Sequence, residues 1–241
     1  MKIKSLWVLI LSPFFLLSQN EQDSNIYHFD IKKESIFLPN QKKTWSYHHA
    51  LNVSIIYLPN SWLESTVSAP MIHYKSNFYL PYNFALISDI KTLAVANEVR
   101  LGARYHINIL KKYFIGAGFQ MGYNFGMLND YGFDNKVYVF QNHPELSVGF
   151  TTNKFAFTLM GKLDLINKVY YSAGELNTST NVKQFNGYSL GISMEQQISK
   201  KKSFSLGFIM NRNQFHILGW PAFNVIRTQY WIPEAFFGFK L

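Results

Sequence analysis

Charged residues stand two positions apart at several places in the chain, a spacing that puts them on one face of an extended strand. Glu98 precedes Arg100 in this way, and Lys162 precedes Asp164. Opposite charges on an enclosed face must be paired or hydrated, so we expect a buried network that stabilises the fold or, alternatively, a ligand site or ion path. The candidate residues are Glu98, Arg100, Arg104, Glu145, Lys162, Asp164 and Glu195.

The residues indicate a metal site or a catalytic site less strongly. His143 and Glu145 share a face by the same spacing, which would suit two ligands of a metal ion, but no third ligand accompanies them. Asp130, Asp134 and His216 stand in expected loops that could approach one another, as the groups of a membrane-embedded hydrolase would. No local motif connects them. We therefore expect no metal, no other cofactor and no catalytic residue.

The segments that must position these residues alternate between two kinds of side chain. From Tyr113 to Gly126 one row is aromatic or aliphatic, while the other is mostly glycine with Gln120 and Asn124. A period of two predicts strand. A glycine-rich row suits a crowded barrel lumen, and a broad apolar row suits lipid. The stretch from Leu93 to Tyr105 alternates similarly and is expected to form the preceding arm.

The N-terminus has the features of a secretory signal peptide, which we assign to residues 1–18: Lys2 and Lys4 precede an apolar run that ends before Ser18. Residues 19–43 are expected to be a short periplasmic segment, and residues 44–241 the barrel. The chain has no cysteine, which excludes disulfides and thiol chemistry. With 48% hydrophobic residues and no other long apolar run, strands facing lipid are favoured over a soluble β-sandwich or lipocalin-like carrier.

Connection lengths predict the topology. Outer-membrane barrels have short periplasmic turns and long outer loops. Expected short connections are 81–83, 107–112, 152–154 and 199–202, and expected long ones are 127–137, 167–186 and 213–227. The fold class is therefore all-β, a closed antiparallel up-and-down transmembrane β-barrel of ten strands with both termini in the periplasm. Eight strands is the alternative, if residues 59–92 form one outer loop. A turn is expected near Ala96 and Asn97.

The formal charge is +9, and removal of Lys2 and Lys4 leaves +7. The lysine clusters at 42–43, 111–112 and 200–202 fall before or between strands, where turns meet an anionic membrane boundary, and no nucleic-acid motif is present. Expected partners are outer-membrane lipid, lipopolysaccharide and the barrel-assembly machinery. The expected function is a structural or binding protein with a narrow, largely filled lumen. A small-solute channel or transporter, or a hydrolase of lipid or peptide, are the alternatives.

The C-terminal residues alternate up to Leu241, with Ala235, Phe237 and Phe239 on one face. This pattern resembles the terminal strand that the barrel-assembly machinery recognises, with leucine where phenylalanine is commonest. The chain also resembles an uncharacterised family of Bacteroidota outer-membrane β-barrel proteins, which implies fold and location only. The residues that carry this resemblance are Leu58–Trp62, Ser68–Pro70, Tyr79–Pro81, Trp220–Pro221 and Ile232–Glu234.

Overall fold

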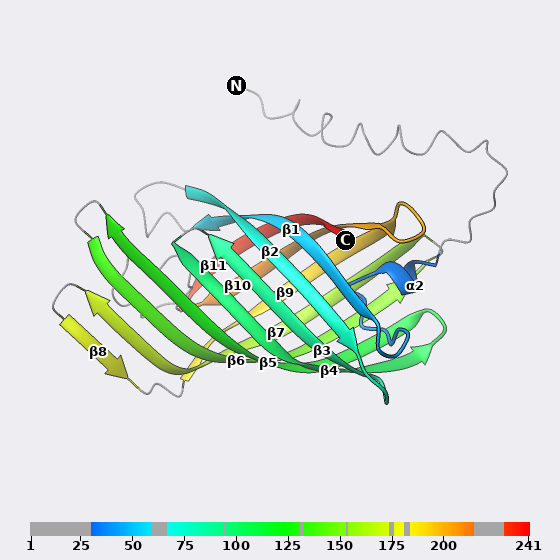
Figure 1. Cartoon of the computed structure of the whole chain (residues 1–241), viewed down its shortest axis with the longest axis horizontal. Helices are drawn as coiled ribbons and strands as arrows, with labels where there is room; N and C mark the ends of the chain where they lie inside the picture. The colour runs from blue at the N-terminus through cyan, green and yellow to red at the C-terminus, as the bar shows by residue number, and fades with distance from the viewer. Residues whose placement is uncertain are drawn as a thin grey trace, which may run out of the picture.

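The computed structural model of the protein is a closed antiparallel barrel (Figure 1). It describes residues 30–58, 67–93, 95–130, 133–152, 154–173, 176–180, 184–214 and 229–241. The strands are β1 (Tyr47–Leu58), β2 (Val67–Tyr79), β3 (Phe84–Leu93), β4 (Ala96–Leu110), β5 (Tyr113–Asp130), β6 (Phe133–Thr151), β7 (Phe155–Ala173), β8 (Leu176–Thr180), β9 (Gln184–Gln197), β10 (Ser203–Asn213) and β11 (Tyr230–Lys240).

Ten strands surround the lumen. The sheet has eleven, but β8 pairs with β7 alone among the described strands and only prolongs it into a hairpin. Pairing of β1 with β11 and of β6 with β7 closes the ring. The ten-strand prediction is confirmed. The eight-strand alternative is wrong, because β2 and β3 pair with each other and with both neighbours.

The outer face is apolar from one end to the other. Leu101 and Met121 lie near mid-strand and are each at least 60% exposed. Aromatic residues gather toward the strand ends, as in the cross-strand contacts of Tyr113 with Phe150 at one end of the barrel and of Tyr188 with Trp231 toward the other. An aliphatic belt between aromatic girdles is the surface that a barrel presents to lipid. No helix in the described part of the chain is long and apolar enough to cross a membrane.

Several expected boundaries were wrong. Leu93 pairs with Ala96, so the third strand ends at Leu93 and the fourth begins at Ala96, and the stretch from Leu93 to Tyr105 is not one arm. The expected loops 127–137 and 167–186 are largely strand, because β5 and β6 pair as far as Asp130 and Phe133 and β7 continues to Ala173. Hydrophobic alternation can end where lipid ends, while backbone pairing continues into water.

The expected turn at 81–83 is confirmed. Tyr82 and Asn83 have φ angles of 60° and 64°, and Phe84 N donates to Pro81 O at 3.4 Å. Two central residues with positive φ define the type I′ turn that matches the twist of a hairpin. The turn joins β2 and β3 at the barrel end where the C-terminus also lies.

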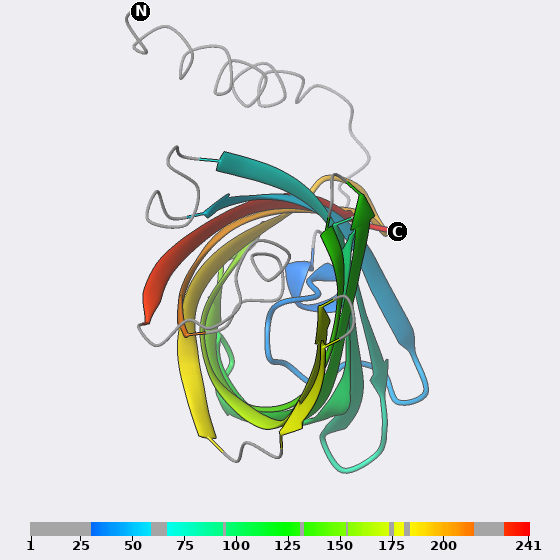
Figure 2. The same ribbon diagram turned by 90° about the vertical axis from the view of Figure 1, so that its left-hand side faces the viewer.

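The segment before β1 enters the barrel. Its short helix α2 (Ile31–Glu34) lies inside the ring of strands, visible through the lumen in Figure 2. Ile31, Ile36 and Leu38 are almost completely buried. The sequence had suggested only a periplasmic lead-in for residues 19–43. Those before residue 30 lie outside the described part, as does the expected signal peptide.

We expect arginine on the outer face to destabilise the barrel according to its depth. Leu101 and Leu110 belong to the same strand and are 60% and 63% exposed, but Leu101 is central while Leu110 ends β4 at the rim. Leu101→Arg should cost about 2 to 4 kcal/mol and Leu110→Arg about 0 to 1 kcal/mol. Urea unfolding in lipid vesicles measures both. Equal costs would contradict the lipid-facing assignment.

Candidate functional site: the charged lumen

Asp89 on β3 is the centre of one half of a charged layer inside the barrel. Its Oδ1 lies 2.9 Å from His73 Nε2 and 3.2 Å from Lys75 Nζ, both on β2. Gln120 Nε2 on β5 donates to the other oxygen, Oδ2, at 2.8 Å. All four residues are buried. Asp89 therefore has donors to both oxygens, as a buried carboxylate requires.

The other half of the layer joins β4, β6 and β7. Arg104 contacts Glu145 Oε1 through Nε at 2.7 Å and Nη2 at 2.6 Å. His143 Nδ1 lies 2.6 Å from Asp164 Oδ1, which Lys162 Nζ approaches to 3.5 Å. Arg100 Nη2 lies 3.3 Å from Glu98 Oε2. Six of the seven predicted site residues thus belong to this layer.

Sequence reasoning missed the contribution of β2, β3 and β11. Lys91 Nζ contacts both oxygens of Glu234, at 3.0 and 2.9 Å, and so links β3 to β11 across the lumen. His73 with Lys75, and Asp89 with Lys91, show the same two-residue spacing that identified Glu98 and Arg100. That spacing could have identified these four residues as inward-facing. They were overlooked because alternation in β2 and β3 is less regular.

The seventh predicted residue, Glu195 on β9, binds the N-terminal segment instead. Its carboxylate accepts three consecutive backbone N–H groups, from Ile36 at 2.6 Å, Phe37 at 3.0 Å and Leu38 at 3.3 Å. From β2, Asn77 Nδ2 donates to Ile36 O at 2.9 Å. Hydrogen bonds to a charged group are the stronger kind, so Glu195 is the principal anchor of this segment.

Packing and charge add to this anchoring. Phe37 stacks on Phe236 of β11 with ring centroids 5.1 Å apart. Any side chain at Gly149 would collide with the segment, since a Cβ there would lie 2.5 Å from Leu38 Cδ1. Lys240 at the end of β11 pairs with Glu34. Burial, and then the positive charge of Lys240, lower the pKa of Lys42 to about 7.

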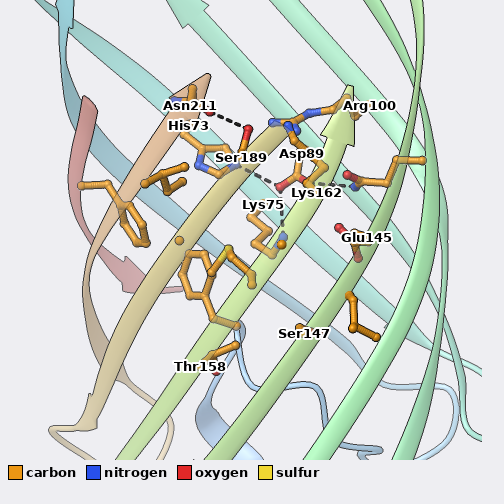
Figure 3. Close-up of a pocket in the computed structure, with 18 of the residues that line it drawn as sticks. His73, Lys75, Asp89, Arg100, Glu145, Ser147, Thr158, Lys162, Ser189 and Asn211 are labelled. Carbon is orange, nitrogen blue, oxygen red and sulfur yellow. Dashed lines mark hydrogen bonds and ion pairs between the residues drawn. The ribbon is translucent and has the colours of Figure 1, made fainter. Parts of the chain in front are cut away.

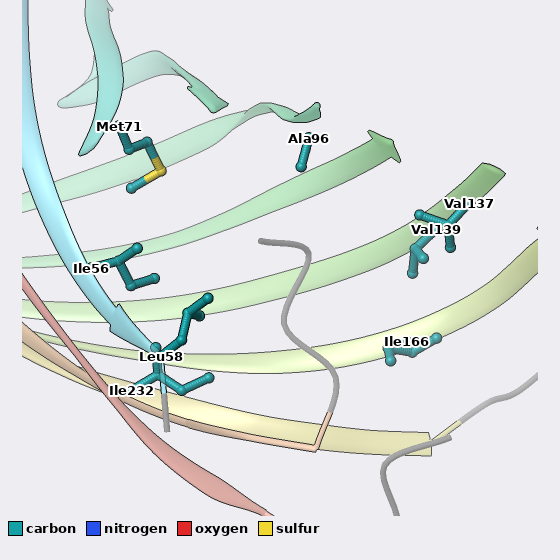
Figure 4. Close-up of a cluster of buried hydrophobic side chains, with 8 residues drawn as sticks. All are labelled: Ile56, Leu58, Met71, Ala96, Val137, Val139, Ile166 and Ile232. Atoms are coloured by element: carbon teal, nitrogen blue, oxygen red, sulfur yellow. The ribbon is translucent and has the colours of Figure 1, made fainter. Parts of the chain in front are cut away.

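The far end of the lumen is apolar. Side chains from six strands converge there (Figure 4) and are almost fully buried; they are Ile56, Leu58, Met71, Ala96, Val137, Val139, Ile166 and Ile232. The lumen therefore has three layers: the N-terminal segment, the charged network and this apolar cluster.

A cavity of about 80 Å³ remains between the charged layer and Phe37 of the N-terminal segment. Figure 3 shows its charged and polar lining, drawn from strands all around the barrel. Its cationic residues are Lys75, Lys91, Arg100, Arg104 and Lys162, and Ser189 of β9, beside Lys162, and Asn211 of β10 add polar groups. The volume admits only water or a small ligand.

The proposed metal and catalytic groups are not assembled into a site among the described residues. His143 and Glu145 bind different partners, Asp164 and Arg104, and no described cluster of three or more potential ligands could hold a metal ion. His216 lies outside the described part, and the side chain of Asp130 is not described. The hydrolase arrangement therefore stays untested.

Fold and lumen together define the class of outer-membrane-type β-barrels. No protein-family model and no curated protein matches the sequence. Similar solved structures include the translocator domain of the autotransporter NalP from Neisseria meningitidis, with 10% identity over 84% of this chain and 90% of that one (TM-score 0.44). Neisserial surface protein A has 10% identity over 81% and 96% (TM-score 0.40). The KdgM porin has 11% over 79% and 97% (TM-score 0.39).

Removing one partner of the Arg104–Glu145 pair should be costly. Arg104→Met leaves the Glu145 carboxylate, whose side chain is only 13% exposed, without its cation, a loss of about 3 to 5 kcal/mol. Adding Glu145→Gln should restore most of the lost free energy of unfolding. Urea unfolding measures these free energies, and the exposed Lys112→Met is the control, with a change below about 0.5 kcal/mol. A double variant as unstable as Arg104→Met would contradict the pairing.

The anchoring role of Glu195 is testable by thiol labelling, since the chain has no cysteine. Leu38→Cys places a thiol at a fully buried position and should react slowly with a charged maleimide. Glu195→Ala should accelerate that reaction at least about tenfold, because a hydrogen bond to a charged group contributes about 1.5 to 3 kcal/mol and 1.4 kcal/mol is tenfold. Lys201→Cys, exposed at a turn, should react quickly in both backgrounds.

Proposed function

We propose that the protein is an integral outer-membrane barrel that is sealed against diffusion and acts as a structural or binding protein. The observation that carries this proposal is the N-terminal segment inside the lumen. Three of its backbone N–H groups donate to the carboxylate of Glu195. A chain segment fixed in this way occupies the space through which a solute would have to pass.

The rest of the lumen supports the same reading. Beyond the segment lie paired charges and then a cluster of buried apolar side chains. A barrel of eight strands is just wide enough for its side chains to fill, whereas aqueous channels appear at about 16 strands. Ten strands with an inserted segment are close to the filled limit, so general porin activity is not expected.

The proposed orientation puts both termini in the periplasm. The turns at the terminal end are short, and the lysines 111–112, 154 and 200–202 lie there. The opposite end carries the hairpins β5–β6 and β7–β8, which extend furthest from the barrel in Figure 1. These hairpins would be the outer surface available for binding. The resemblance to Bacteroidota barrels agrees with this location and adds no activity.

A small-solute channel is the second candidate, favoured by the charged cavity. Conduction would require the N-terminal segment to leave Glu195 and the charged layer to open. A channel therefore requires a state of the lumen that differs from the one in the structure.

Planar bilayers provide the test of sealing. The purified protein should show no sustained open conductance, because all three layers would have to open together. Porin-sized steps in the wild-type protein, with ion selectivity altered by Glu98→Ala or Arg100→Ala, would establish a channel through the charged layer and overturn the sealed barrel.

Orientation is tested in intact cells with single cysteines at two exposed positions. Asn129→Cys lies near the tip of the β5–β6 hairpin and Lys201→Cys in the β9–β10 turn. A membrane-impermeant maleimide should label the first and leave the second unlabelled until the outer membrane is permeabilised. The reverse result would place the termini outside.

A further inference from the structure

The cavity in the lumen has an unequal charge lining. Five cationic side chains reach it: Lys75, Lys91, Arg100, Arg104 and Lys162. Only two carboxylates line it, those of Asp89 and Glu145. The remaining acidic partners, Glu98, Asp164 and Glu234, pair with these cations but do not line the cavity. The space is therefore electropositive although the whole layer is balanced.

We propose that this cavity binds one small inorganic oxyanion, of the size of phosphate or sulfate. This inference builds on the proposed binding role and names a ligand class for it. A cavity of about 80 Å³ is large enough for several water molecules, and therefore for one central atom with its oxygens.

Arg100 provides the clearest donor. It is 5% exposed, and its Nε has no hydrogen-bond partner among the described residues. Its one described ion pair is the 3.3 Å contact from Nη2 to Glu98. A guanidinium is a planar fork of donors that matches an oxyanion, and an unpaired buried donor is costly. An anion in the cavity would satisfy it.

Lys162 supplements Arg100 on the cationic side. Its side chain is 20% exposed, and its nearest described carboxylate oxygen, on Asp164, is 3.5 Å away. An ammonium group has three N–H donors, so the Lys162 ammonium can also donate to an anion in the cavity.

The two carboxylates of the lining do not oppose an anion strongly, because both are already engaged. Asp89 accepts from Lys75 and Gln120 and contacts His73. Glu145 is bound twice by Arg104. Their charge is thus compensated by groups fixed on neighbouring strands, and the unsatisfied donors of Arg100 and Lys162 determine which ligand the cavity accepts.

Calorimetric titration of the full-length protein in detergent, at low salt, tests the proposal with phosphate and with sulfate. Chloride at matched ionic strength controls for screening. We expect saturable binding of one oxyanion per barrel, weakened at least tenfold by Arg100→Gln and by Lys162→Gln. Lys201→Gln removes the same charge from an exposed turn and should bind like the wild type. A heat-dependent gel shift verifies that each variant is folded.

No saturable binding of either anion to the wild-type protein would overturn the inference, as would equal weakening by Lys201→Gln. If Arg100→Gln does not fold, Lys162→Gln decides by itself, since the Lys162 side chain is partly exposed and its removal leaves the Arg104–Glu145 pair intact. Planar-bilayer conductance tests the sealed barrel separately. A barrel that conducts and also binds the anion would contradict the sealed barrel and still support the anion site.

Discussion

Closure of the backbone ladder is the constraint on which the rest of the structure depends. An unpaired N–H or C=O group in hydrocarbon costs several kcal/mol, so a membrane-spanning sheet must join its first strand to its last. Here β1 pairs with β11 from Ala50–Lys240 to Ile56–Glu234. The same pairing encloses a lumen whose inward side chains no longer meet bulk water freely. Each inward polar group then needs a partner from another strand, from the N-terminal segment or from a bound species.

The charged layer meets this need by pairing across strands. Lys75 with Asp89 connects the two strands of one hairpin, while Arg104 with Glu145 and Lys91 with Glu234 connect strands that are not consecutive in sequence. Buried pairs of this kind add little net stability, but loss of one partner is costly. They therefore favour one strand register over others, because a shift by one residue would turn every charge toward lipid.

The N-terminal segment and the cavity give the lumen its functional character. Glu195 presents one carboxylate to three backbone N–H groups, a contact that needs no particular side chains in the segment it holds. Gly149 and Gly116 leave room for Leu38 and Pro39. Between this segment and the charged layer, cationic side chains with unused donors surround a small space. The barrel is thus closed around a polar interior.

The sequence by itself determined the class of fold, the strand count and the two faces of the regularly alternating strands, because the period of two, the glycine-rich inner row and the connection lengths are local properties. It also identified inward charges such as Glu98, Arg100 and Arg104, which the structure buries. Only the tertiary structure decided which charges meet: Lys91 and Glu234 are 143 positions apart, and register depends on all intervening hairpins. The tertiary structure also placed residues 30–43 in the lumen. Glu195 binds backbone amides of this segment, and contacts to the backbone leave no pattern in the side chains of a sequence.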